Sequence, residues 1–107
     1  MRGERKKFLI IEKLSEILEE IINGEGFFTI LNISLPQKGG IMKVLISIYP
    51  DEKANDIIKE LNSMQNKIKS ELKERIYLRY LPKRIKFIYS KDLKEMEEID
   101  KILKDLS

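Results

Sequence analysis

The sequence predicts a small α+β domain in which helices cover a three-stranded sheet. Apolar residues recur every three or four positions in several stretches, which is typical of amphipathic helices. They alternate with other residues in three short stretches, which is typical of strands. A chain of 107 residues is the size of one domain with one core, so residues 1–107 are expected to form a single unit. The predicted order of elements is α-β-β-α-α-β-α.

The first helix is predicted over residues 4–23, and Asn23-Gly24 should end it because both residue types accept a left-handed backbone. Two strands follow, over residues 27–35 and 42–49. Pro36-Gln37-Lys38-Gly39-Gly40 lies between them and has the length and composition of a hairpin loop. The apolar stripe of the first helix consists of Ile10, Ile11, Leu14, Ile17, Leu18, Ile21 and Ile22.

A helical stripe runs from Ala54 to Ile76, and Asp51 is placed to cap its start. Residues 62–66 (Asn-Ser-Met-Gln-Asn) are polar and modest helix formers. Two structures fit this pattern: two helices joined by a kink, or one helix of about 25 residues. If the chain is kinked, Asn66 is expected either to take a left-handed conformation or to cap the second helix.

The third strand is predicted where Ile85, Phe87 and Tyr89 alternate with Lys86 and Ile88. A last amphipathic helix should begin with the capping-box pattern of residues 92–95. Its apolar stripe consists of Leu93, Met96, Ile99, Leu103 and Leu106.

Positive charge is concentrated in one stretch of the chain. Residues 61–91 hold nine Lys or Arg and two Glu, a net of +7, whereas the whole chain has a net charge of only +3. Residues 1–60 have a net of −1 and residues 92–107 a net of −3. A local basic block of this kind is typical of proteins that bind a phosphate backbone.

The candidate RNA-binding residues come from this basic block. Asn66 is included because a helix start presents backbone N–H groups to phosphate, and Tyr77 and Tyr80 because aromatic rings interleaved with Arg can stack on bases. The alternatives without RNA binding are that the basic residues form a solvated helix face and that the tyrosines pack at the edge of the core. The predicted phosphate contacts are Asn66, Lys67, Lys69, Lys73, Arg75, Arg79, Lys83, Arg84 and Lys86.

Composition argues against an enzyme. The chain has no Cys and no His, which removes thiolate nucleophiles, disulfides, the usual general base and the commonest metal ligands. No glycine-rich phosphate loop is present, and the acidic runs are best explained as solvated helix faces. No cofactor or metal is therefore expected. No apolar run approaches the ~18 residues of a membrane span, so we expect a cytoplasmic protein without membrane contact. We also expect the chain to be a monomer.

The order and spacing of several short motifs resemble the ribosome-binding factor A family. Leu78-Arg79-Tyr80-Leu81-Pro82, preceded by Ile68-Lys69 and followed by Phe87, is similar to its Leu-Arg-x-x-Pro region. Residues 29–35 and 43–49 resemble its first two strands, and residues 2–6 its basic start. The likeness covers about residues 2–107. Met64-Gln65-Asn66 stands where the family has Ala-x-Gly, and Lys69 stands where it has Arg.

The resemblance implies a type II KH-like fold and a non-enzymatic role in ribosome biogenesis. Such an assembly factor binds 16S rRNA in free 30S subunits, assists rRNA processing at the 5′ end, and helps growth in the cold. The alternative function is a basic protein-interaction module that docks on an acidic partner. Both functions predict salt-sensitive binding, and they differ in whether structured RNA or a polyanionic protein displaces the partner.

Overall fold

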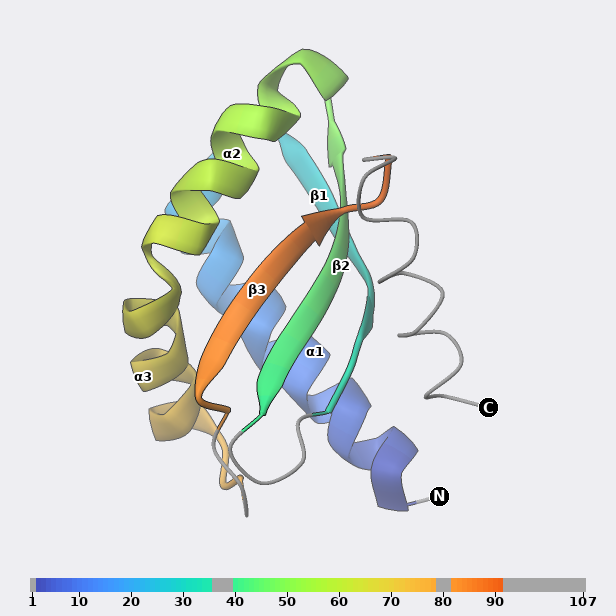
Figure 1. Ribbon diagram of the computed structural model, residues 1–107, viewed down its shortest axis with the longest axis vertical. Helices are drawn as coiled ribbons and strands as arrows, with labels where there is room; N and C mark the ends of the chain where they lie inside the picture. The colour runs from blue at the N-terminus through green and yellow to red at the C-terminus, as the bar shows by residue number, and fades with distance from the viewer. Residues whose placement is uncertain (1, 36–39, 79–81, 92–107) are drawn as a thin grey trace.

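The computed structural model describes residues 2–35, 40–78 and 82–91 (Figure 1). It confirms the α+β class and the order α-β-β-α-α-β of the first six predicted elements. The predicted last helix lies outside the described residues. The elements are α1 (Arg2–Ile22), β1 (Phe27–Ile33), β2 (Ile41–Tyr49), α2 (Asp51–Ser63), α3 (Gln65–Arg75) and β3 (Arg84–Tyr89).

The three strands form one sheet in the order β1-β2-β3. β1 pairs with β2 in antiparallel fashion, whereas β2 and β3 run parallel. A parallel pair needs a long crossover connection, and α2 with α3 supplies it. Figure 1 shows α1 crossing behind the sheet, with α2 and α3 beside it. The crossover therefore places α3 next to the edge strand β3.

The core lies between the helices and one face of the sheet. Each helix contributes the stripe that its sequence predicts, and each strand contributes alternate residues. No polar or charged residue of the described chain is buried. The largest fully buried side chains are Phe87, Ile10, Leu14, Ile17, Leu18, Ile33, Met42, Ile46, Leu61, Ile68, Leu72 and Ile85.

The end of α1 is set by two residues with a left-handed backbone, as predicted. Asn23 has a φ of 42° and Gly24 a φ of 84°. The Asn23 N–H donates to the Glu19 carbonyl at 2.9 Å, and the Glu25 N–H donates to the Ile22 carbonyl at 3.0 Å. These bonds satisfy carbonyl groups that a helix end leaves without partners.

β1 contains a bulge that the alternating sequence did not reveal. Ile30 pairs with Ile46 and Asn32 with Leu45, so Leu31 is the extra residue. Strict alternation would send Ile30 and Ile33 to opposite faces of the sheet. The extra residue brings both into the core, while Leu31 stays exposed.

The helix break occurs at Met64, which decides between the two structures that the sequence allowed. Met64 has φ −97° and ψ 9° and separates α2 from α3. The Met64 N–H still donates to the Glu60 carbonyl, and the Ile68 N–H donates to the Met64 carbonyl, both at 3.0 Å. The junction is therefore a tight kink rather than a loop.

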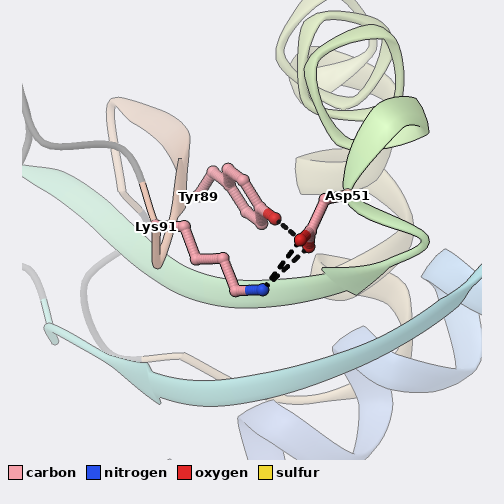
Figure 2. A network of polar contacts seen from close by, with 3 residues as sticks. All are labelled: Asp51, Tyr89 and Lys91. Carbon is pink, nitrogen blue, oxygen red and sulfur yellow. Dashed lines mark hydrogen bonds and ion pairs between the residues drawn. The ribbon is translucent and has the colours of Figure 1, made fainter.

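The prediction that Asp51 caps α2 is wrong. Pro50 occupies the N-cap position, and Asp51 is the first helical residue. Its carboxylate instead accepts a 2.7 Å hydrogen bond from the Tyr89 hydroxyl and 2.9 Å hydrogen bonds from the Lys91 ammonium (Figure 2). This cluster ties the end of β3 to the start of α2.

The hydrogen bond from Tyr89, followed by that from Lys91, lowers the pKa of the Asp51 carboxyl below its usual value of 3.8. Tyr89 and Lys91 donate these hydrogen bonds to the Asp51 carboxylate, which favours their protonated forms. The pKa values of Tyr89 and Lys91 therefore lie above their usual 10.0 and 10.5. A lowered carboxyl pKa contributes stability above the unfolded pKa, and this contribution is lost as the pH falls through the folded pKa.

We therefore predict that Asp51→Asn lowers the melting temperature near neutral pH. The difference from the parent chain should shrink as the pH falls below the usual carboxyl pKa of 3.8. Thermal melts followed by circular dichroism over a pH series measure this. Asp56→Asn, on the same helix and also exposed to solvent, is the control and should melt like the parent at every pH. A constant difference across the series would contradict the role of the charge.

Candidate nucleic-acid interface

The candidate interface is built around the outer edge of β3. The buried side chains Ile85 and Phe87 alternate with Arg84 and Lys86, which therefore point to the face of the sheet away from the core. α3 packs alongside this strand. Basic residues from the helix and from the strand thus approach the same edge.

Side chains from the α2–α3 kink bond the outer backbone of β3. The Asn62 amide donates to the Phe87 carbonyl at 3.2 Å and accepts from the Phe87 N–H at 2.8 Å. The Gln65 side-chain carbonyl accepts from the Ile85 N–H at 3.0 Å. An edge strand otherwise exposes these groups for pairing with another chain. Asn62 and Gln65 therefore take the place of a fourth strand.

Lys69 joins α3 to the turn before β3. Its ammonium group donates to the Lys83 carbonyl at 3.1 Å, and its side chain is half-buried. The interaction leaves the positive charge in place, since the acceptor is neutral. Lys69 and Lys83 are thus held side by side although they are far apart in the sequence.

Helical geometry separates the basic residues of α3 into two groups. Successive residues lie about 100° apart around the axis, so Lys69 and Lys73 fall on the flank nearest β3. Lys67 falls on the opposite flank, which it shares with Glu71 four residues later. Lys67, Lys73, Lys83 and Arg84 are all exposed. We call Lys69, Lys73, Lys83, Arg84 and Lys86 the basic edge.

Arg75 does not belong to the basic edge. Its guanidinium lies 3.5 Å from a Glu16 oxygen and 3.6 Å from a Glu20 oxygen, both on α1. These ion pairs fasten α3 to α1 and share the charge of Arg75 with two carboxylates. Exposed pairs of this kind contribute about 0–1 kcal/mol each. Arg75 is therefore better explained as a docking residue of the fold.

The two predicted backbone roles of Asn66 are wrong. Asn66 is the second residue of α3, where its backbone is helical, and Met64 holds the N-cap position. Its exposed side chain accepts a 2.9 Å hydrogen bond from the Gln65 amide. Tyr77 is 84% exposed just beyond α3, so its ring is accessible for stacking. Arg79 and Tyr80 lie outside the described residues.

Sequence reasoning missed two features of this site. Lys43 of β2 pairs in register with Lys86 and, by the alternation of β2, points to the same face of the sheet. Its alternation with Met42 and Val44 was the available signal, but the strand lies outside the basic block. The bonds from Asn62 and Gln65 to β3 were also missed, because no local pattern reveals a partner in a distant strand.

None of the helices among the described residues has the length and hydrophobicity of a membrane-spanning segment. No group of acidic side chains there is arranged to hold a metal ion.

The fold and the basic edge define a small KH-like domain. The crystal structure of ribosome-binding factor A from Thermus thermophilus superposes with a TM-score of 0.68, at 17% identity, over 81% of this chain and 93% of that one.

Sequence comparison gives the family itself. Residues 2–103 match the family described as Ribosome-binding factor A. Ribosome-binding factor A of Staphylococcus carnosus (strain TM300) is 31% identical over 99% of this chain and 94% of its own length. The protein of that name from Natranaerobius thermophilus is 31% identical over 100% and 86%. The chain belongs to the ribosome-binding factor A family, as the resemblance implied.

The hydrogen bonds between the Asn62 side chain and the Phe87 backbone allow a prediction about stability. Asn62→Ala removes both bonds to Phe87 and leaves an N–H and a carbonyl without protein partners, which should cost about 1–3 kcal/mol. Urea denaturation of the parent and the variant measures the loss.

Asn66→Ala is the matched control, because it removes the same amide one turn further along an exposed surface. Alanine favours helix by about 0.5 kcal/mol over asparagine, so this variant should be neutral or slightly more stable. Equal losses in the two variants would show that the Asn62 bonds to β3 contribute nothing specific.

Proposed function

We propose that this chain is a small-subunit assembly factor that binds 16S rRNA in immature 30S subunits through its basic edge. The observation that carries the proposal is the gathering of Lys69, Lys73, Lys83, Arg84 and Lys86 along one strand edge. Membership of the ribosome-binding factor A family supports a ribosomal partner. Cations in a row displace condensed counterions from a phosphate backbone, which is the main source of non-specific RNA affinity.

The contacts would be made mostly by side chains. KH domains with a glycine-rich loop clamp the nucleic-acid backbone with that loop, whereas here the helices are joined by the single residue Met64. Phosphate contacts position a protein without reading sequence. Specificity would then come from the shape of the rRNA, with the exposed Tyr77 available for stacking on unpaired bases. Tyr80 stays a prediction from the sequence.

The mechanism is a shift of population rather than catalysis. A factor that binds one rRNA conformation more tightly than its rivals raises the share of that conformation without consuming nucleotide. We propose that the favoured state is the one from which the 5′ end of the rRNA is processed. Misfolded RNA helices rearrange slowly at low temperature, so the loss of such a factor should impair growth most in the cold.

The second candidate function is a protein-interaction module in which the basic edge docks on an acidic protein. The same cations support it. A competition assay with labelled 30S subunits bound to the chain separates the two functions. If the basic edge binds RNA, structured rRNA should displace the subunits. If it binds protein, a polyanionic protein should be the better competitor. Cofractionation of the chain with free small subunits in sucrose gradients tests the ribosomal partner directly.

We predict that the double variant Lys73→Glu/Lys83→Glu loses affinity for 30S subunits at low salt and keeps its melting temperature. Both side chains are exposed, so their loss should cost little stability. For the parent chain, log K should fall against log[salt] with a slope of several units if five or more phosphates are engaged.

The control is Lys53→Glu/Lys59→Glu on α2, which changes the net charge by the same amount at exposed positions outside the basic edge. This control should retain most of the affinity. If both double variants bind equally weakly, overall charge rather than the basic edge governs binding, and the proposed interface is wrong.

A further inference from the structure

The end of the sheet that carries the start of β1 and the end of β2 presents an exposed aromatic pair. Phe27 and Tyr49 face each other in the antiparallel register. Directly opposed residues point to the same face with Cβ atoms about 4.5–5.5 Å apart. Phe27 is 78% exposed and Tyr49 69% exposed. Two large rings adjoining in water are unusual enough to mark an interaction surface.

The backbone beneath this pair is closely packed. A Cβ on Gly26 would lie 2.9 Å from the Tyr49 carbonyl oxygen, so this position accepts no side chain without movement. Phe27 also lines an open depression of about 340 Å³ between α1 and β1, together with Glu19 and Asn23. Phe27 therefore belongs both to the aromatic pair and to the rim of the depression.

The charge around the pair is negative. Residues 19–28 and 49–52 hold five carboxylates and no Lys or Arg. Asp51 is paired with Lys91 (Figure 2) and Glu20 with Arg75, whereas Glu19, Glu25 and Glu52 occupy exposed positions. Figure 1 shows the turn between β2 and α2 at one end of the long axis and α3 toward the other. The aromatic pair and the basic edge thus lie in regions of opposite charge.

We propose that Phe27, Tyr49 and the surrounding carboxylates form a docking site for an arginine- or lysine-rich peptide segment of a partner protein. Aromatic faces attract cations, and carboxylates add charge-assisted hydrogen bonds to guanidinium groups. Aromatic rings alone would also suit unpaired RNA bases, but here the neighbouring carboxylates repel phosphate. The site is separate from the basic edge and does not depend on the proposed RNA binding.

A short fluorescent peptide of alternating arginine and glycine is the probe, and anisotropy with the intact chain measures its binding. Phe27→Leu/Tyr49→Leu keeps the apolar character but removes the aromatic faces, so binding should weaken at least about threefold. Glu19→Gln/Glu25→Gln should weaken binding at low salt. Phe8→Leu is the matched control, since Phe8 is equally exposed, at 76%, near the basic start of α1, and its loss should change nothing.

Melting temperatures close to that of the parent show that the variants remain folded, and nuclear magnetic resonance shifts at Phe27 and Tyr49 on peptide addition would support the site. The proposal is overturned if Phe27→Leu/Tyr49→Leu binds the peptide like the parent, or if Phe8→Leu weakens binding as much. It is also overturned if a single-stranded uridine oligonucleotide, rather than the peptide, binds in a manner that requires the aromatic pair.

Discussion

The hydrogen bonds from Asn62 and Gln65 to the outer backbone of β3 are the constraint on which the rest of the candidate interface depends. They occupy the N–H groups of Ile85 and Phe87 and one carbonyl on an edge that would otherwise be open. Because the donors and acceptors come from both sides of Met64, they also hold the kink against the strand. α3 then runs beside β3, and Lys69 reaches the Lys83 carbonyl. The same hydrogen bonds thus protect the outer edge of β3 and bring the residues of the basic edge together.

Much of the fold could be predicted from the sequence because local patterns were consistent with it. The three- and four-residue spacing of α1 places its stripe in the core, and Asn23-Gly24 ends the helix with left-handed backbones. Features that depend on distant partners could not be predicted. The bulge at Leu31 follows from the pairing of β1 with β2. Asp51 binds the end of β3 instead of capping α2, because a local cap competes with tertiary partners for the same carboxylate.

The sequence identified the segment that carries most basic residues of the candidate site, but not how these residues are arranged in space. Net charge along the sequence identified the basic stretch, and it counted Lys67, Lys73 and Arg75 alike. The structure separates them by the rotation of α3 and by the carboxylates of α1, which neutralise Arg75 but lie far from it in sequence. Lys43 was overlooked for the converse reason, since pairing of β2 with β3 brings it beside Lys86 from outside the basic stretch. Charge counts therefore find the segment, and topology decides which cations act together.

The kink at Met64 determines what kind of nucleic-acid contact this domain can make. A glycine-rich loop between the helices would expose several backbone N–H groups to a phosphate, whereas here the N–H groups of Met64 and Ile68 donate to the carbonyls of Glu60 and Met64. In the proposed RNA binding, attraction therefore comes mainly from ammonium and guanidinium groups on flexible side chains. Such contacts are strongly salt-dependent, tolerate many sequences and adapt to the spacing of phosphates. These properties suit a factor that recognises the overall shape of a folding RNA and then leaves it.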